Sequence, residues 1–300
     1  MDTPRHRACS PRRRGGAFHL NETDPSTRYV LGHSDRELAR LTRQGAQTQP
    51  ITREFLVAAG VTDGMRVLDV GTGAGDVAFL ASELVGDNGW VVGIDREPEV
   101  LALARERAGA LGLRNVSFQE ADASNLTFES SFDAVIGRYV LQFQPEPESV
   151  LRRLVNHLRP GGLVAIHESD WTSFKSIPSV HIWDRCGRLA TEALKAGGAE
   201  TQTGTKLPSI FAAAGLPSPS MRMTTIVGAG AQSRYACTRA ADLVLTLLPS
   251  IESLGLVKPG ELNPETLAEQ MMADVSASGS MVIAWSEVAA WCRVLAPARG

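Results

Sequence analysis

The stretch Val67–Asp76, VLDVGTGAGD, decides how this sequence is interpreted, because an apolar run leads directly into three glycines at alternate positions. Glycine permits a tight bend and lets a ligand approach the backbone closely. Gly71, Gly73 and Gly75 therefore predict a strand-to-helix turn that faces a ligand. A tight turn without a ligand would explain a bare glycine cluster equally well, so the residues around it must decide.

Short apolar runs alternate with helical patterns on both sides of this turn. Such alternation, with nearly continuous apolar strands, predicts a parallel sheet covered on both faces. Right-handed crossovers make it doubly wound, with a ligand crevice at the carboxyl ends of its strands. The predicted strands are residues 66–70, 90–95, 116–122, 132–138 and 163–169, and the predicted helices are 77–85, 98–112 and 148–162, the last closed by Pro160–Gly161–Gly162.

Two helices are predicted before the first strand, and the alternation slows after Ser169. Residues 171–215 are predicted to be mainly loop and helix, 220–228 a strand, and 231–278 mostly helical. The apolar stretch MVIAWSEVAAWCRVL at 281–295 fits either a strand or a helix, because its periodicity does not distinguish the two.

Two acidic residues at neighbouring strand ends support a ligand at the glycine turn. Asp95 ends the second strand, where a carboxylate can accept both hydroxyls of a ribose. Asp122 ends the third, where it could accept from an adenine amine beside the Ala123 amide. Three successive strand ends thus indicate an adenosine compound.

The charge around the turn indicates which adenosine compound. The spacing is G-x-G-x-G, whereas a dinucleotide fingerprint has G-x-G-x-x-G. Asp69 and Asp76 flank the glycines, and an acidic loop suits a cation better than a diphosphate. This favours the sulfonium and amino groups of S-adenosylmethionine and argues against a nicotinamide oxidoreductase.

VLDVGTGAGD, VVGID, EADA, FDAVIGRYVLQF and LRPGGLVAIHESD resemble the motifs of class I S-adenosylmethionine-dependent methyltransferases, in their small-molecule branch. YVLGHSDRELARLTRQ is similar to their helical lid. The resemblance implies a mostly parallel, seven-stranded, Rossmann-like sheet with an antiparallel strand at one edge, and so favours a strand for 281–295. The predicted organisation is a disordered basic tail (1–27), a helical lid (28–62), a cofactor-binding core (63–170), and completion of the sheet with lid insertions at about 171–215 and 231–278 (171–300).

The resemblance also implies which residues hold the methionine, ribose and adenine parts of the cofactor. They are Asp69, Gly71, Gly73 and Gly75 for the methionine part and ribose, Asp95 for the ribose, Asp122 and Ala123 for the adenine, and Gly137, Arg138 and Gln44 near the amino-acid end.

His167 and Glu168, at the end of the fifth predicted strand, are the candidate general bases. Neighbouring strand residues point to opposite faces, so both can face the site only where the strand has ended. Charged residues that merely position the next helix are an equally good interpretation. Tyr29, Tyr139 and Trp171 are candidate substrate-pocket residues, with core packing as the alternative.

Composition limits the possible partners. A net charge of −3 and a charged fraction of 21% argue against a nucleic-acid binder, which would show a basic face. No apolar run approaches the 18 residues of a membrane helix, so no membrane partner is expected. The four cysteines have no metal-ligand spacing; this predicts no metal site and favours the reducing cytoplasm.

The sequence therefore predicts an enzyme that moves a methyl group from S-adenosylmethionine to an oxygen, nitrogen or carbon of a small, partly apolar metabolite, with S-adenosylhomocysteine as the other product. Natural-product biosynthesis is the expected setting, and the N-terminal helices could join protomers in a homo-oligomer. The alternatives are a cyclisation in which the bound cofactor is structural, and a non-catalytic cofactor-binding module.

Overall fold

The computed structural model describes residues 48–123, 125–126, 128 and 131–294. The predicted tail, most of the predicted lid, and with them Tyr29 and Gln44, lie outside these residues. The strands are β1 (Arg66–Val70), β2 (Trp90–Asp95), β3 (Val116–Glu120), β4 (Phe132–Arg138), β5 (Leu158–Asp170), β6 (Lys175–Ile177), β7 (Ser220–Ala229) and β8 (Met281–Arg293). The helices are residues 48–59, α2 (Asp76–Val85), α3 (Pro98–Ala110), α4 (Pro147–Val155), α5 (His181–Ala196), α6 (Thr203–Ala213), α7 (Arg234–Ser253) and α8 (Leu267–Ser278), with 3-10 turns η1 (Leu141–Phe143) and η2 (Gly230–Ser233).

The strands form one sheet in the order β3-β2-β1-β4-β5-β8-β6, and β7 also pairs with β8. Strands β1 to β5 are parallel to one another, whereas β8 runs antiparallel to β5, β6 and β7. This confirms the predicted doubly wound, mostly parallel sheet. It has eight strands rather than seven because the three-residue β6 pairs with the first residues of β8.

Apolar side chains on both faces explain why the strands of the sheet's centre are almost wholly buried. Helices α2, α3 and residues 48–59 pack on one face, around Leu80, Leu101 and Val67. Helices α4 and α6 pack on the other, around Leu154, Phe211 and Val164. Because neither face of these strands is solvated, their residues need not alternate between polar and apolar, which explains their nearly continuous apolar runs.

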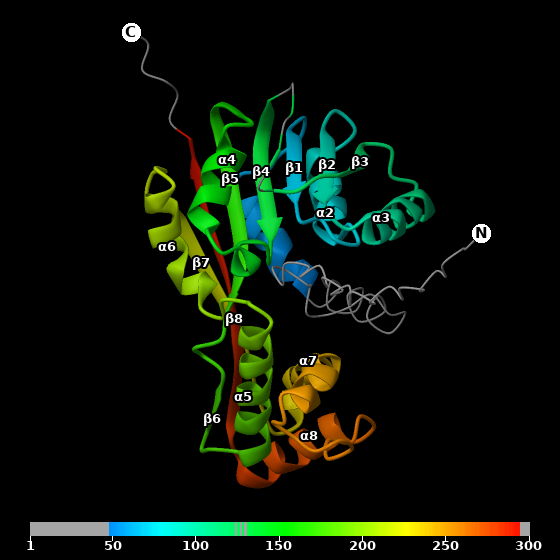
Figure 1. The fold of residues 1–300 in the computed structure, drawn as a ribbon, viewed down its shortest axis with the longest axis vertical. Helices are drawn as coiled ribbons and strands as arrows, with labels where there is room; N and C mark the ends of the chain where they lie inside the picture. Colours follow the sequence, from blue (N-terminus) through cyan, green and yellow to red (C-terminus); the bar gives the residue numbers. More distant parts are fainter. Residues whose placement is uncertain (1–47, 124, 127, 129–130, 295–300) are drawn as a thin grey trace, which may run out of the picture.

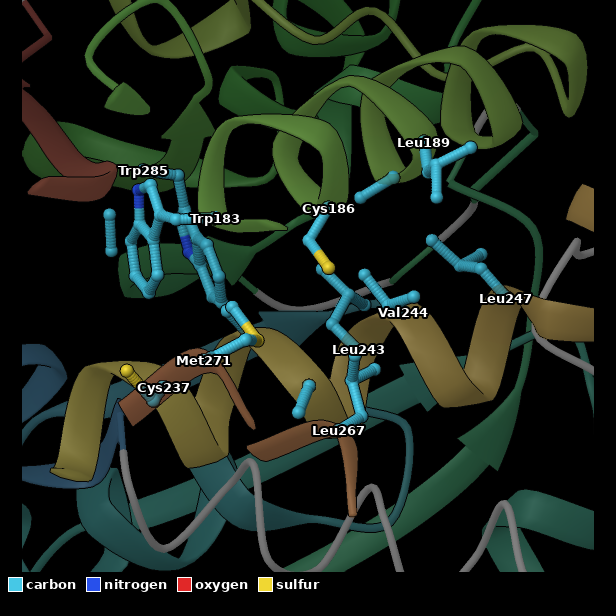
Figure 2. Close-up of a cluster of buried hydrophobic side chains, with 14 of the residues drawn as sticks. Trp183, Cys186, Leu189, Cys237, Leu243, Val244, Leu247, Leu267, Met271 and Trp285 are labelled. Carbon is cyan, nitrogen blue, oxygen red and sulfur yellow. The ribbon is translucent and has the colours of Figure 1, made fainter. Parts of the chain in front are cut away.

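A third hydrophobic cluster lies beyond the carboxyl ends of the parallel strands, where α5, α7 and α8 pack together. Figure 2 shows α5 and α7 facing each other, with Cys186 of α5 lying opposite Val244 of α7 and with Met271 of α8 close to Trp183. The long strand β8 runs from this helical layer into the sheet (Figure 1). It therefore belongs to both halves of the molecule.

Two predictions about elements were wrong in detail. Pro160–Gly161–Gly162 does not close a helix, because α4 ends at Val155 and β5 begins at Leu158. These residues form an irregular stretch in the β4–β5 register, where proline offers no N–H and Gly161 has a φ of 78°. The closing apolar stretch is a strand, but an interior one, because β7 and β6 continue the sheet beyond it.

Helix α6 lies within the predicted insertion 171–215 and packs against the sheet. The side chains that it buries there include Leu207, Ile210 and Phe211. Of the elements in that stretch, α5 joins the helical layer, whereas α6 covers the face of β5 and β8.

Candidate functional site

The registers of the parallel strands bring the predicted site residues to one edge of the sheet. Val70 at the end of β1 is paired with Ile94 of β2 and Gly137 of β4. The next residue on each strand is therefore level with the others, which places Gly71 beside Asp95. Gly137 and Arg138 are the last two residues of β4, whose bounds match the predicted strand.

The three glycines of the turn all have left-handed φ angles, at 62°, 52° and 89° for Gly71, Gly73 and Gly75. A Cβ on Gly71 would lie 2.9 Å from Val140, and one on Gly75 would lie 2.5 Å from Phe79. A Cβ on Gly73 would have nothing within 4 Å. The protein's own side chains thus crowd the outer two glycines, and the middle glycine is the one that leaves space for a ligand.

Asp95 connects the end of β2 to this turn. Its Oδ2 accepts from the Gly73 N–H at 3.0 Å, and its Oδ1 accepts from the Glu97 N–H at 3.1 Å. The Ala121 N–H donates to the Asp95 carbonyl, 2.9 Å away, and Asp122 follows as an exposed residue. The carboxylates predicted for ribose and adenine are therefore neighbours, next to the open glycine.

Asp69 lies beneath the turn and is almost fully buried. Burial raises the pKa of this carboxyl to about 7, although a hydrogen bond from the Thr72 hydroxyl, at 2.7 Å, lowers it. Oδ1 of Asp69 has no hydrogen-bond partner among the described residues. A buried carboxylate oxygen without a donor is costly, and a cationic amino group would supply both the donor and the charge.

Asp76 begins α2 and is paired with two arginines. Arg107 Nη2 lies 2.7 Å from its Oδ1, and Arg138 Nη2 lies 3.9 Å from its Oδ2. Arg138 therefore stands between the first turn of α2 and the end of β4, where a ligand carboxylate would find a cation.

These contacts fit S-adenosylmethionine. Gly73 provides space for the ligand to approach, Asp95 can accept from ribose hydroxyls, Asp69 has an oxygen for the amino group, and Arg138 can pair with the carboxylate. When bound, this cofactor supplies a methyl group already activated on a sulfonium.

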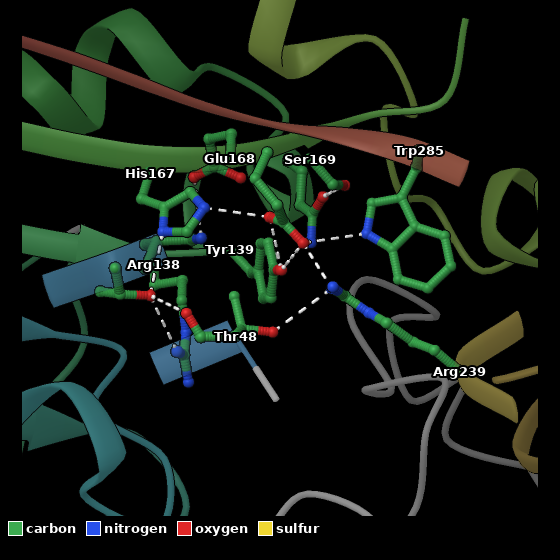
Figure 3. A network of polar contacts seen from close by, with 12 residues as sticks. Thr48, Arg138, Tyr139, His167, Glu168, Ser169, Arg239 and Trp285 are labelled. Atoms are coloured by element: carbon green, nitrogen blue, oxygen red, sulfur yellow. Dashed lines mark hydrogen bonds and ion pairs between the residues drawn. The ribbon is translucent and has the colours of Figure 1, made fainter. Parts of the chain in front are cut away.

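A second cluster of polar side chains lies next to this edge, between β4, β5, β8 and α7 (Figure 3). Its centre is Glu287 of β8, which has 0% of its surface exposed. Tyr139 donates its hydroxyl to the Glu287 carboxylate at 2.7 Å, the Trp285 indole donates at 3.0 Å, and Arg239 Nη2 donates at 2.5 Å. We call Glu287, Tyr139, His167, Arg239 and Trp285 the Glu287 network.

Glu287 is the fixed negative charge of this network. Burial alone would raise its pKa, but the hydrogen bond from His167 and the charge of Arg239 lower it to about 2. The carboxylate is therefore ionised at neutral pH. Burial acts to lower the pKa of Arg239, and the Glu287 carboxylate overrides that effect, so this pKa is raised and the guanidinium stays charged.

His167 is held at both ring nitrogens. Nε2 lies 3.0 Å from Glu287 Oε2, and Nδ1 lies 3.3 Å from Thr52 Oγ1. Burial lowers the pKa of His167 more than the Glu287 carboxylate raises it. Because a carboxylate only accepts, Nε2 carries a proton, and Nδ1 lies beside the Thr52 hydroxyl, which donates to the Thr48 carbonyl at 3.2 Å. Both ring nitrogens thus contact groups of the protein in this arrangement.

Glu168 faces away from His167, as alternation along a strand that continues to Asp170 requires. Its Oε1 accepts from the Val140 and Leu141 N–H groups at 2.9 and 2.7 Å. Burial raises the pKa of this carboxyl to about 8 despite those bonds. Of the two candidate bases, Glu168 thus supports the turn after β4.

That turn contains Tyr139, whose φ of 59° is rare for a bulky residue. The Tyr139 N–H donates to the His167 carbonyl at 2.9 Å, and the hydroxyl reaches Glu287. Its ring lies 5.6 Å from the His167 ring and under the Arg138 guanidinium, at 5.7 Å. Tyr139 therefore connects the cofactor edge to the Glu287 network, as a pocket residue would.

Trp171 lies in a column of stacked rings. Its ring centre is 4.7 Å from that of Trp285 and 5.8 Å from that of Phe174, which in turn stacks on Trp183 at 4.6 Å. Trp171 is buried and contacts both the Trp285 and the Phe174 rings. In this arrangement it packs in the core, and its predicted place in a substrate wall stays a prediction.

Glu287 and Arg239 were not among the residues predicted for the site. A signal for each was present: Glu287 is the one acidic residue in the apolar run 281–292, and Arg239 stands among alanines on α7. A lone charge within an apolar element indicates a buried partner. The identity of that partner, 48 residues away, has no local signature.

The described residues contain no group of three or more His, Cys, Asp or Glu side chains that could hold a metal ion. Over the same part of the chain, no helix combines the length and the apolar character that a bilayer crossing requires.

Comparison with known proteins agrees with the cofactor that these contacts fit. The family described as "Methyltransferase domain" matches residues 61–215, about half of the chain. An arsenite methyltransferase of Halobacterium salinarum is 38% identical over 154 residues, which are 51% of this chain and 39% of that protein. An aklanonic acid methyltransferase of a Streptomyces species is 39% identical over 117 residues, 39% of this chain and 53% of that protein.

Among solved structures, that of a protein from Bacillus halodurans aligns with a TM-score of 0.53 and 18% identity, over 81% of this chain and 97% of that one. This likeness shows the fold. The matched region spans about half or less of the curated relatives described above.

Proposed function

The chain belongs to the class I S-adenosylmethionine-dependent methyltransferases, and on that premise we propose that it transfers the sulfonium methyl group to a small, partly apolar metabolite. The accepting atom is an oxygen, nitrogen or carbon, and the second product is S-adenosylhomocysteine. The observation that carries the proposal is the alignment of Asp69, Gly73 and Asp95 at one sheet edge, with an unpartnered oxygen on Asp69 and open space at Gly73.

Each residue of that edge has a part in binding. Asp95 accepts from the ribose and holds the glycine turn, and Asp122 with Ala123 receives the adenine. Arg138 pairs with the carboxylate of the amino-acid end, and Asp69 takes the amino group. Gly71 and Gly75 shape the turn through their contacts with Val140 and Phe79, and Gln44 completes the amino-acid end.

The acceptor lies on the side of Tyr139, because this residue connects the cofactor edge to the Glu287 network. Methyl transfer is an in-line displacement, and most of its rate can come from holding the acceptor about 3–3.5 Å from the methyl and excluding water. The buried aromatic column and the helical layer provide the apolar surroundings for this step. Tyr29 contributes to the same apolar surroundings of the acceptor.

Small-molecule acceptors are also named in the two curated relatives, arsenite and aklanonic acid. The second of these relatives supports a role in natural-product biosynthesis. The three cysteines of the described chain are free and buried, which agrees with a cytoplasmic enzyme. We further propose that neither nucleic acid nor membrane is a partner and that any homo-oligomer forms through the N-terminal helices.

Calorimetric titration with S-adenosylmethionine, with NAD as comparator, tests the proposal. We expect micromolar binding of S-adenosylmethionine alone. Asp95→Ala should weaken it at least tenfold, about 1.4 kcal/mol, whereas Asp87→Ala, on the exposed turn before β2, should leave it unchanged. Binding of NAD instead, or of neither compound, would refute the cofactor assignment.

Turnover is then measured as release of S-adenosylhomocysteine in the presence of candidate acceptors. Release together with a methylated product supports methyl transfer. Product formation without S-adenosylhomocysteine would instead support a cyclisation with a structural cofactor.

A further inference from the structure

Arg239 has more hydrogen-bonding capacity than its protein partners use. It lies on α7 with 3% of its surface exposed, and its Nη2 donates to Glu287 and to the Thr48 hydroxyl at 3.3 Å. Nη1 and Nε have no hydrogen-bond partner among the described residues. The guanidinium carbon lies 4.3 Å from the centre of the Trp285 ring, which covers one face of the group (Figure 3).

Pairing with Glu287 does not explain these two nitrogens. One donor is enough to neutralise the carboxylate, and Trp285, Tyr139 and His167 supply the rest of its hydrogen bonds. A buried N–H without an acceptor is costly, and more so on a charged group. Buried polar groups without partners are rare in native proteins, and an absent ligand is one physical explanation.

The partner of these nitrogens must provide an oxygen acceptor. Arg239 is charged and only donates, and its neighbours in the network are themselves donors to Glu287. The position of Tyr139, between Arg138 and Glu287, places Arg239 on the acceptor side of the cofactor edge.

The same network indicates that this oxygen arrives already ionised. Glu287 has a pKa of about 2, so it is a poor proton acceptor. His167 has both ring nitrogens engaged, and Glu168 faces away from it. A group bound at Arg239 therefore finds a positive charge and no described residue ready to remove its proton.

We propose, as a refinement of the methyltransferase function, that Arg239 anchors a carboxylate of the methyl acceptor, which makes the acceptor an organic acid with an apolar body. The Trp285 ring, which stacks on Trp171, lies against one face of the guanidinium. It gives the apolar part of such a molecule a neighbouring surface, and Glu287 holds the guanidinium in place.

Binding of matched acids and amides tests the anchor. The probes are benzoate, 1-naphthoate and anthracene-9-carboxylate, each compared with its primary amide by calorimetry, with and without saturating S-adenosylhomocysteine. We expect at least one acid to bind the protein ten times more tightly than its amide. Equal binding of every pair, as an ordered water at Arg239 would produce, overturns the proposal.

Substitutions at two arginines of α7 locate the effect. Arg239→Gln should abolish the preference for the acid, whereas Arg234→Gln, at the exposed start of the same helix, should retain it. Arg239→Lys keeps the ion pair with Glu287 but lacks the two additional nitrogens, so it should fold and still lose the preference. A preference that survives in Arg239→Lys and Arg239→Gln contradicts the anchor. If the unsubstituted protein did not bind S-adenosylhomocysteine at all, that result would instead contradict the proposed function.

Discussion

The two halves of the candidate site differ in how they are built. Most of the cofactor edge, from Asp69 to Ala123, comes from one continuous stretch of chain, and some of its polar groups are exposed or unpartnered. The Glu287 network joins the turn after β4 to β5, α7 and β8, and all of its members except the half-buried Tyr139 are buried. The difference shows that a set of strand ends can be specified locally, whereas a network between distant elements depends on tertiary structure.

The largest effect is expected where the network loses its central charge. Glu287→Ala should lower the free energy of unfolding by about 3–5 kcal/mol, because it leaves the buried Arg239 charge without its partner. Urea unfolding measures this. Glu83→Ala, which breaks an exposed ion pair with Arg53, is the matched control and should cost about 0–1 kcal/mol. Similar losses in the two variants would mean that the network is not a buried charge pair.

Within the cofactor edge, the three glycines should divide into two kinds. Gly75→Ala combines left-handed strain with overlap on Phe79, so it should destabilise the fold by about 2–4 kcal/mol. Gly73→Ala meets open space and should cost only about 1–2 kcal/mol. Binding should show the opposite order. For each kcal/mol of unfolding free energy that is lost, Gly73→Ala should lower the affinity for S-adenosylmethionine more than Gly75→Ala does. Equal ratios in the two variants would contradict a ligand at Gly73.

Glu168 provides a test by pH. Its pKa is raised by burial from 4.5 to about 8, so the folded state holds this proton more tightly than the unfolded state. Its contribution to stability is fully present below pH 4.5 and is lost as pH rises through 8.

Glu168→Gln still accepts from the two backbone N–H groups and cannot ionise. Relative to the unsubstituted protein, it should gain about 1–3 kcal/mol in free energy of unfolding between pH 5 and pH 8. Urea unfolding at the two pH values measures the gain, and Asp69→Asn separates the smaller contribution of the other raised carboxyl. Parallel stability curves for Glu168→Gln and the unsubstituted protein would show that Glu168 is not buried as described.

The smallest effect is expected for cofactor affinity. Asp69 has a pKa of about 7, and its charged form is the one that suits a cationic amino group. Affinity for S-adenosylmethionine should therefore rise about tenfold from pH 6 to pH 8. Asp69→Asn should remove this dependence while Asp76→Asn keeps it. Calorimetry at both pH values measures this affinity. If the affinity of Asp69→Asn still depended on pH, that result would contradict the assignment.

The extent of prediction from sequence follows the same division. The parallel strands and the residues at their ends were predictable, because apolar runs and glycine spacing report local geometry. The irregular stretch at Gly161 and the interior place of β8 were not, because both depend on pairing between distant strands. Glu287 and Arg239 were missed for the same reason, and the opposite orientations of His167 and Glu168 followed only once β5 was seen to continue to Asp170.

The shared strand β8 has a consequence for how the chain folds during synthesis. Strands β1 to β5 and their crossover helices can pair as they leave the ribosome, but β8 follows every other described element in the chain. Until it is made, β5 has an open edge, β7 has no described strand beside it, and Arg239 has no counter-charge. An open strand edge can pair with another chain. Nascent or truncated chains that end before Met281 should therefore be the aggregation-prone form of this protein, and the Glu287 network is completed last.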